Sequence, residues 1–294
     1  MEISILIVSK NRKQELNKSL LILQPFLDFT KHEVLVFLDG CSDNSYDLKS
    51  EMSWVRWYGA AKSIGASPAR AALYKKAKGF YFIGLDDDAH PLYSDFIIQT
   101  ISVFKKYPNV GVIAFEEIKG IFKSDADALK SVDSQPMVYL TNEFIGCGFA
   151  IKKSVYEATN GFPVWMDIYG EESCLSIEVL SKGYDILYTN AIKVNHRVDK
   201  EARKLSGNNY YRFERQLRHT TYYYLVYYKN PLFKITKLYL HNFKKYALTD
   251  ILCFKLFFKV VCEVIINSYN ILKYRDPIDA KVLRKMNKIK GIKF

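Results

Sequence analysis

Short apolar segments alternate with helical segments over the first 115 residues of the chain. The apolar segments are typical of strands buried on both faces of a sheet, and they are ISILIVS (3–9), EVLVFLDG (33–40), WVRWYG (54–59), FYFIGL (80–85) and VGVIAF (110–115). Apolar residues at helical spacing fall between them, over 11–23, 65–77 and 94–107. This alternation predicts an α/β fold with a mostly parallel, Rossmann-like sheet flanked by helices.

The sequence after residue 115 follows this pattern less clearly. Residues 116–142 are polar and support no assignment. Residues 169–188 predict a helix that begins after two acidic residues and ends at Gly183, and an apparent strand then leads to His196.

Charge divides the chain into two parts. The 294 residues contain 43 Lys and Arg against 31 Asp and Glu, a net charge of +12. Residues 207–294 hold 18 basic and 5 acidic residues, which leaves 25 basic and 26 acidic residues in 1–206. Eleven of the 22 tyrosines also follow residue 206. We therefore expect a nearly neutral body over 1–206 and a basic, aromatic helical extension over 207–294.

The cysteines and the apolar segments bear on the location of the protein. The five cysteines are odd in number and include no C-x-x-C pair, which argues against a disulfide framework or a zinc site and for a reducing cytosol. The N-terminal segment MEISILIVSKNRKQ has no basic region ahead of its short apolar run, so no signal peptide is expected. The nearest candidate for a membrane span, 251–272, is interrupted by Lys255, Lys259 and Glu263. A cytoplasmic protein is therefore predicted.

Carboxylates follow two of the predicted strands at the point where each strand ends. Asp39 closes the second strand, and Asp86, Asp87 and Asp88 close the fourth. Ligands of parallel α/β sheets bind at the carboxyl ends of the strands. In an extended chain Asp86 and Asp88 point to the same side, where paired carboxylates are ligands for Mg²⁺ or Mn²⁺. A lone D-x-D is more often a solvated acidic turn, but the second strand-end aspartate favours the metal site.

Two glutamates and a histidine in the second half are further candidates. Glu171 and Glu172 stand at the predicted helix start, where one of them stabilises the helix dipole and the other is a candidate general base. His196 has two open interpretations, a packed or surface side chain and a third metal ligand.

Six motifs occur in order within residues 3–197: VSKNR, LDGCSDNS, GASPAR, LDDDAHP, GCGFAIKKSVYEATNGF and GEES. In this order they resemble the motifs of the family 2 glycosyltransferases, inverting enzymes of the GT-A fold. The sequence departs from the family pattern at Leu38, where Asp is frequent, and at Glu172, where Asp is usual. The resemblance implies a nucleotide-sugar half over about 1–115 and an acceptor half over about 143–206.

The resemblance also implies roles for individual residues. For the nucleotide sugar, Ser9, Asn11 and Asp39 would line the base and ribose pocket, Arg70 would lie near the diphosphate, and Asp87 would approach the ribose. For the metal, Asp86, Asp88 and His196 would hold Mn²⁺ or Mg²⁺ under the diphosphate. For catalysis, Glu172 would deprotonate the acceptor hydroxyl, with Glu171 as the second candidate.

The reaction implied by the resemblance is transfer of a sugar from a nucleoside-diphosphate sugar, with inversion at the anomeric carbon. UDP is the first expectation for the nucleotide and dTDP the second. The acceptor would be a hydroxyl of a glycan or of a lipid-linked saccharide. By analogy with relatives of this size, the setting is bacterial surface-polysaccharide assembly, as for capsule or lipopolysaccharide.

Two other functions compete with this one. The net positive charge and the interleaved Tyr and Lys of 210–230 fit a nucleic-acid-binding protein, but the body carries no net positive charge, so we expect no nucleic-acid partner. A sugar nucleotidyltransferase also uses paired carboxylates and a metal, but the chain has no early glycine-rich, lysine-bearing phosphate loop.

The extension contains a segment that is apolar around most of its circumference. Over 251–267, Lys255, Lys259, Glu263 and Asn267 form one narrow helical stripe, with apolar residues around the rest. Two partners for the apolar surface remain open. One is the body or a second subunit, as in a homodimer. The other is an anionic membrane surface, which would place the protein peripherally on the inner face of the cell membrane.

Overall fold

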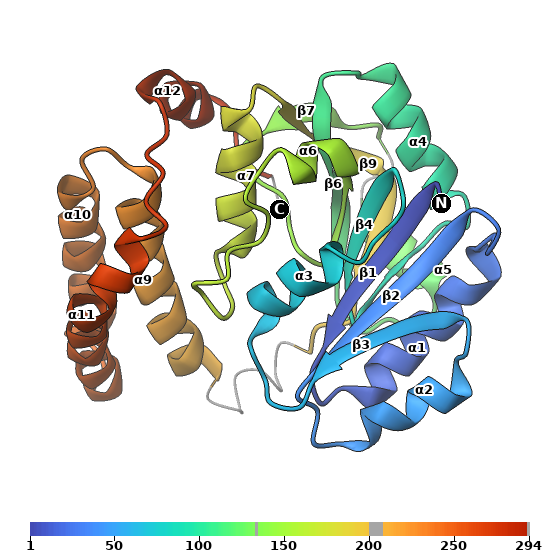
Figure 1. Cartoon of the computed structure of the whole chain (residues 1–294), viewed down its shortest axis with the longest axis horizontal. Coiled ribbons are helices and arrows are strands. Elements are labelled where there is room, and N and C mark those ends of the chain that lie inside the picture. Colours follow the sequence, from blue (N-terminus) through green and yellow to red (C-terminus); the bar gives the residue numbers. More distant parts are fainter. Residues whose placement is uncertain (133–134, 200–207, 293–294) are drawn as a thin grey trace.

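The computed structural model describes residues 1–132, 135–199 and 208–292. In these ranges nine strands form one sheet in the order β3–β2–β1–β4–β8–β6–β9–β5, with β7 also paired to β9 (Figure 1). The strands are β1 (Ile3–Ser9), β2 (His32–Asp39), β3 (Val55–Ala60), β4 (Tyr81–Asp86), β5 (Ala89–Pro91), β6 (Val110–Lys119), β7 (Val138–Thr141), β8 (Gly148–Lys152) and β9 (Asp185–His196).

The strands expected in the first 115 residues are β1, β2, β3, β4 and β6, and the last of these continues to Lys119. β1, β2, β3 and β4 pair in parallel, as do β6 and β9. β8 lies antiparallel between β4 and β6, and β5 and β7 are antiparallel to β9. Six of the nine strands in the described residues therefore run in one direction. The mostly parallel α/β fold is confirmed.

Helices cover both faces of the sheet. They are α1 (Lys13–Leu23), α2 (Leu48–Glu51), α3 (Ala66–Tyr74), α4 (Phe96–Lys106), α5 (Asp125–Lys130), α6 (Lys153–Glu157) and α7 (Glu171–Ser181). Because side chains alternate along a strand, Ile5 of β1 packs with Leu20 of α1 on one face, and Leu6 packs with Leu73 of α3 on the other. Two apolar layers thus hold the strands rigidly from both sides and fix the edge at which their carboxyl ends meet.

The segment 116–142, which the sequence left unassigned, contains the end of β6, helix α5 and strand β7. Its polar residues are largely exposed to solvent, as Lys123, Ser124 and Asp125 are, and β7 lies at the margin of the sheet. Glu116 and Glu117 continue β6 in parallel beside Lys193 and Val194 of β9. The extra length of β6 brings Glu117 to the edge where the candidate site lies.

The extension forms a layer of helices beside α7 (Figure 1). Its elements are α9 (Asn208–Tyr227), α10 (Leu232–Asn242), a π-helical turn (Phe243–Ala247), α11 (Ile251–Leu272) and α12 (Ala280–Lys288). Tyr222 and Val226 of α9 share an apolar cluster with Cys174 and Ile177 of α7. The Tyr227 hydroxyl donates a 2.5 Å hydrogen bond to Glu178. The extension is therefore packed against the body through α9 and α7.

Within the described residues, no helix has both the length and the apolar character needed to cross a membrane. The expected boundary between body and extension at 206/207 lies outside the described residues. The division of the body into halves over 1–115 and 143–206 stays a prediction.

Candidate functional site

A cavity of about 1850 Å³ opens at the carboxyl ends of the parallel strands. One wall contains Ser9, Asp39 and Asp86, which end β1, β2 and β4. The opposite wall contains residues of α9, such as Tyr211 and Arg212. The cavity therefore lies between the sheet edge and the extension, at the place where α/β folds bind ligands.

Strand pairing brings Asp86, Asp88 and His196 together. β5 begins directly after Asp88 and pairs antiparallel with the end of β9, so that Ala89 lies opposite His196. The His196 Nε2 atom is then 3.2 Å from Asp88 Oδ1 and 4.0 Å from Asp86 Oδ2. Asp86 and Asp88 face the same side, as their i, i+2 spacing predicts. One ligand atom from each of the three residues lies within 4.8 Å of the others.

The chemistry of this cluster fits a divalent cation. Asp88 is almost fully buried, and its Oδ1 atom forms no hydrogen bond to any described residue although it faces His196. Burial alone would lower the pKa of His196, but the neighbouring side chains of Asp88, Cys147 and Glu117 raise it to about 12. Surroundings that hold a proton so firmly on the ring also favour a divalent cation in that position. Two carboxylates and an imidazole suit Mn²⁺ or Mg²⁺.

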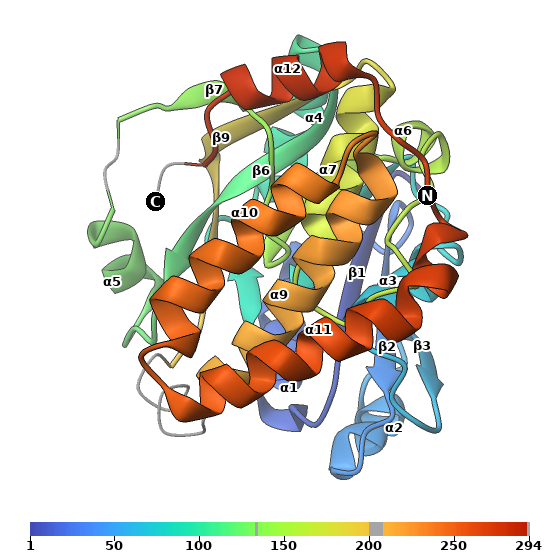
Figure 2. The same ribbon diagram turned by 90° about the vertical axis from the view of Figure 1, so that its left-hand side faces the viewer.

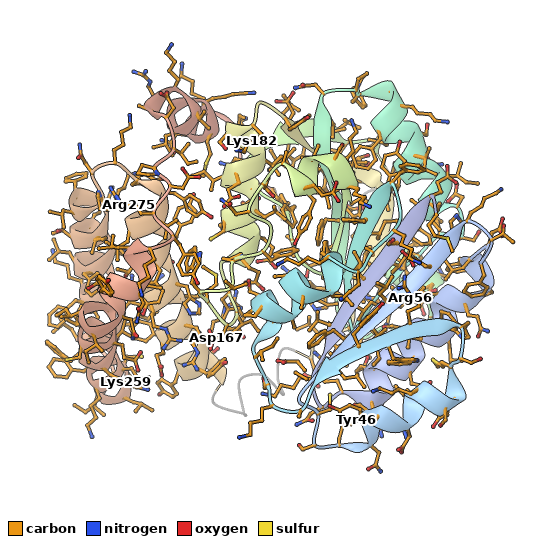
Figure 3. The ribbon with its side chains drawn as sticks, in the orientation of Figure 1. Tyr46, Arg56, Asp167, Lys182, Lys259 and Arg275 are labelled. Atoms are coloured by element: carbon orange, nitrogen blue, oxygen red, sulfur yellow. The ribbon has the colours of Figure 1, made fainter. Side chains whose placement is uncertain are left out.

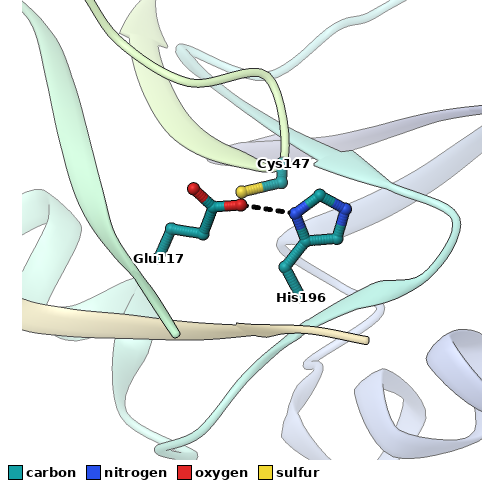
Figure 4. Close-up of side chains that lie close together, drawn as sticks. All are labelled: Glu117, Cys147 and His196. Carbon is teal, nitrogen blue, oxygen red and sulfur yellow. Dashed lines mark hydrogen bonds and ion pairs between the residues drawn. The ribbon is translucent and has the colours of Figure 1, made fainter. Parts of the chain in front are cut away.

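Glu117 orients the ring of His196 (Figure 4). Its Oε1 atom lies 2.5 Å from His196 Nδ1, and because a carboxylate only accepts, Nδ1 carries the proton. Nε2 therefore points toward Asp88. Cys147 belongs to the same cluster, but burial raises the pKa of its thiol to about 12, so it is a neutral thiol rather than a metal-binding thiolate. Sequence analysis missed Glu117, because its role depends on the parallel pairing of β6 with β9.

Arg12 and Ser9 contact three further aspartate oxygens, Asp88 Oδ2 and both carboxylate oxygens of Asp87. Arg12 Nη2 lies 2.7 Å from Asp88 Oδ2, and Nη1 lies 3.4 Å from Asp87 Oδ1. The Ser9 hydroxyl donates a 2.6 Å hydrogen bond to Asp87. Burial raises the pKa of Asp87 to about 7 despite the positive charge of Arg12. Arg12 remains 40% exposed, so part of its guanidinium faces the cavity. Arg12 is the last residue of the motif VSKNR, but the sequence alone predicted no role for it.

Arg70 joins the metal-ligand cluster to the two glutamates. From α3, its Nη2 atom lies 2.7 Å from Asp86, and its Nη1 atom lies 3.2 Å from Glu171 and 3.0 Å from Glu172. Gly146 lies against this network, since a Cβ atom there would meet Glu172 Oε1 at 2.3 Å and the Arg70 nitrogens at 2.9 Å. A side chain at residue 146 would therefore push Arg70 and Glu172 apart.

The two glutamates differ in exposure. Glu171 is buried, and burial followed by the charge of Glu172 raises its pKa to about 8, so it is largely protonated at pH 7. The side chain of Glu172 is 22% exposed and borders the cavity. Glu172 is thus the carboxylate that a ligand in the cavity can reach.

Asp39 and Asn11 are placed differently from each other. Asp39 is buried and accepts hydrogen bonds from the Ser63 hydroxyl and from the backbone N–H groups of Ile64 and Gly65, so it holds the loop ahead of α3 at the cavity. Asn11 accepts hydrogen bonds from the backbone of Ser42 and Asp43. Its amide therefore fixes the turn after β2, and it is not among the residues that border the cavity.

The far wall of the cavity is aromatic and basic. Tyr169 has a φ of 66°, an uncommon backbone conformation that is often found at functional sites. Its ring lies 6.4 Å from that of Tyr211, and Arg212 lies over it at 5.4 Å. Arg215 lies over Tyr211 at 4.3 Å. This wall, which sequence analysis did not predict, faces the carboxylate cluster across the cavity.

Comparison with solved structures identifies the fold. The mannosyltransferase PcManGT from Pyrobaculum calidifontis, solved with GDP-Man and Mn²⁺, superposes with a TM-score of 0.58 at 14% identity, over 97% of this chain and 83% of that one. TarS (residues 1–349) of S. aureus superposes with a TM-score of 0.53 at 12% identity, over 67% of this chain. The chain has a GT-A fold.

A third similar structure is GalNAc-T7, solved with UDP, GalNAc and Mn²⁺, which matches with a TM-score of 0.53 at 16% identity over 67% of this chain. The chain spans 60% of the TarS fragment and 44% of GalNAc-T7. No model of a protein family matches the sequence, and no curated protein matches it. The comparisons therefore establish the fold, and function is argued from the site.

Proposed function

We propose that this protein is a metal-dependent, inverting glycosyltransferase that uses a nucleoside-diphosphate sugar. The observation that carries the proposal is the convergence of Asp86, Asp88 and His196 at one wall of a cavity that Glu172 also borders. A divalent cation held by the first three residues would stabilise the negative charge of a departing diphosphate.

The residues around the cluster supply the rest of the donor site. Arg12 presents a partly exposed guanidinium that can bind a phosphate oxygen while it neutralises Asp88. Arg70 lies against Asp86 and Glu172, and its positive charge offsets these two carboxylates beside an anionic ligand. Ser9, Asp39 and the buried Asp87 shape the wall on which the nucleoside would lie, and Asn11 supports that wall from behind through the turn at 42–43.

Glu172 acts as the general base in this proposal. It removes the proton from the acceptor hydroxyl as that oxygen attacks the anomeric carbon from the face opposite the diphosphate, and this geometry inverts the configuration. The transition state has oxocarbenium character, as in glycoside hydrolysis. Glu171 is held protonated by burial and positions Arg70, and it is the second candidate for the base.

The acceptor would bind against α9. Aromatic faces such as those of Tyr169 and Tyr211 are suited to contact the apolar face of a sugar ring, and Arg212 suits an anionic group. A glycan or a lipid-linked saccharide fits this wall. The setting we propose is surface-polysaccharide assembly in the cytoplasm of a bacterium, by analogy with enzymes of the same fold.

UDP is the first candidate for the nucleotide and dTDP the second. TarS has been solved with UDP-GlcNAc and GalNAc-T7 with UDP, whereas PcManGT has been solved with GDP-Man. A panel of UDP, dTDP and GDP sugars in the presence of Mn²⁺ tests the proposal by thermal shift. A donor at 100 times its dissociation constant should stabilise the fold by about 2.7 kcal/mol.

The product distinguishes the competing functions. A glycosyltransferase releases a nucleoside diphosphate from the sugar donor, whereas a sugar nucleotidyltransferase makes pyrophosphate from a nucleoside triphosphate. No stabilisation by any sugar nucleotide, together with salt-sensitive binding of nucleic acid, would instead favour the nucleic-acid-binding alternative.

A further inference from the structure

Helix α11 has a second apolar face that the described residues leave largely exposed. Its inner face contributes Cys253, Phe257 and Val260 to the core of the extension. Eight large apolar side chains of α11 are exposed, including Leu252 and Ile266, and six of the eight follow one another along the whole helix: Ile251, Phe254, Phe258, Ile265, Tyr269 and Leu272. At 100° per residue these six fall within an arc of about 60°, roughly 120° around the helix from the inner face. The exposed stripe is therefore continuous.

The same outer layer carries further exposed apolar residues. Phe233 and Leu240 of α10 and Leu248 of the following turn are all exposed. In Figure 2, α10 and α11 both lie on the viewer's side of the molecule, outside the sheet, and they diverge from each other with α9 visible between them. Of the 28 large hydrophobic side chains exposed in the described residues, 14 fall between 232 and 274. Contiguous apolar exposure on this scale marks an interaction surface.

The charge around this surface is positive. Residues 232–274 contain seven lysines and two acidic residues, Asp250 and Glu263. Asp250 caps α11 by accepting from the N–H groups of Leu252 and Cys253. Glu263 is paired with Arg218 at 2.8 Å, on the side of α9. Lys237, Lys244 and Lys255 are exposed. Figure 3 shows Lys259 at the outer part of this layer, far from the sheet, where its side chain is 52% exposed although it also pairs with Glu214 of α9. The outer surface is thus apolar with a cationic border.

We propose that the outer face of α10 and α11 docks on a bilayer containing anionic phospholipid. A helix that lies in the membrane interface buries an apolar face and sets cations against the phosphate groups. Helix α11 presents this arrangement over 22 residues, or about 33 Å. A nucleic acid would pair with the lysines but would leave the apolar stripe exposed, and so it fits the surface less well.

Docking in this orientation would leave the cavity close to the bilayer. Leu238 and Asn242 of α10 border the cavity, and Phe233 and Leu240 of the same helix belong to the outer face. One helix thus separates the membrane surface from the cavity. The inference does not depend on the proposed reaction, and vesicle binding tests it without any measurement of activity.

The test is sedimentation of the full chain with vesicles of phosphatidylcholine and phosphatidylglycerol, with vesicles of phosphatidylcholine alone for comparison. We expect binding to the anionic vesicles that added salt reverses only in part, since the apolar contacts persist. F233Q combined with I265Q should lower the partition coefficient between vesicle and solution by about tenfold or more. K237Q combined with K255Q should lower this coefficient by about fivefold per lysine at low salt.

Matched controls separate this face from general surface effects. Phe80 and Ile98, on the body, are 72% and 69% exposed, close to the 76% and 68% of Phe233 and Ile265. F80Q combined with I98Q should therefore leave vesicle binding unchanged. The proposal is overturned if the outer-face variants bind like the wild type. It is equally overturned if the full chain ignores both vesicles and sediments as a dimer that F233Q with I265Q dissociates, because the face would then be a subunit interface.

Discussion

The body (residues 1–199) and the extension (residues 208–292) place their charged side chains in different ways. In the body, ionisable groups converge on one cavity and are buried in pairs, such as Asp88 with His196 and Glu171 with Arg70. In the extension, most lysines point outward beside apolar residues. Buried charges set pKa values and hold ions at fixed positions, whereas exposed cations attract large anionic surfaces. This difference supports our two proposals, that the body acts on a small ligand and that the extension contacts a larger anionic surface.

Removing the metal site is the strongest test of this division. Asp88→Asn, or chelation of the wild type with EDTA, should abolish transfer, since a divalent cation contributes several kcal/mol to the stabilisation of a departing phosphate. The variant should still fold and bind anionic vesicles. Activity is measured as nucleoside diphosphate released, and Mn²⁺ binding by calorimetry. Asp95→Asn, at an exposed position in the body, is the matched control. Full turnover by Asp88→Asn in EDTA would refute the metal site.

The rate of the chemical step distinguishes the roles of Glu171 and Glu172. Glu172→Gln should lower the single-turnover rate by about 10²–10⁴-fold and preserve donor binding, because it removes only the general base. Glu171→Gln should have a smaller effect, since burial already keeps Glu171 protonated at pH 7. If Glu171→Gln shows the larger loss, the base is Glu171. If both variants keep the wild-type rate, the proton is removed by a different group.

The effect expected from a change at Glu117 is smaller than those at Asp88 and Glu172. Glu117→Gln should weaken Mn²⁺ binding by about 10–100-fold, the usual cost of losing the carboxylate that orients a ligating histidine. Calorimetry of Mn²⁺ on the donor-free protein measures this effect directly, and added Mn²⁺ should restore much of the activity. An unchanged affinity for Mn²⁺ would show that Glu117 does not position His196.

The sequence predicted the parts of the body that local patterns determine. The apolar runs define β1, β2 and β4, and the aspartates that follow them mark the edge of the sheet. Contacts between distant segments were not predictable from such patterns. His196 meets Asp88 because β5 pairs with β9, and Glu117 meets His196 because β6 extends beside β9. Arg12 reaches Asp88 across 76 residues of sequence.

In the extension, the polar stripe predicted on α11 has a more specific role than solvation. Lys259 lies 3.2 Å from Glu214 of α9, and Glu263 lies 2.8 Å from Arg218. The stripe therefore faces the neighbouring helix, and the apolar residues divide between the core and the exposed outer face. Helical periodicity gives the position of each residue around the axis, but the direction of the core depends on tertiary packing.

The smallest effect we predict concerns the contact between the two parts. Asp167, in the loop before α7, lies at the boundary in Figure 3. It accepts a 2.9 Å hydrogen bond from Arg215 and lies 3.1 Å from His219 Nε2, both on α9. Burial alone would raise the pKa of Asp167, but the hydrogen bond with His219 and the charges of Arg215 and Arg218 hold it well below its usual value.

A lowered pKa of an acid stabilises the folded state above the pKa of the unfolded state, near 3.8, and this contribution disappears as the pH falls through the folded-state pKa. Asp167→Asn should therefore lower the free energy of unfolding at pH 7 by about 1–2 kcal/mol, the scale of a hydrogen bond to a charged group. The difference from the wild type should begin to shrink below about pH 4, because the unfolded wild-type chain then binds a proton at Asp167 while the folded protein, with its lowered pKa, does not. Urea unfolding at pH 7 and below pH 4 measures this difference in the free energy of unfolding.

Asp47→Asn is the control, because it removes an exposed pair with Lys13 and should leave the free energy of unfolding almost unchanged. A difference that stays constant with pH would mean that the charge of Asp167 does not connect the body to α9. A loss of vesicle binding by the folded variant would mean that the two parts do not act separately.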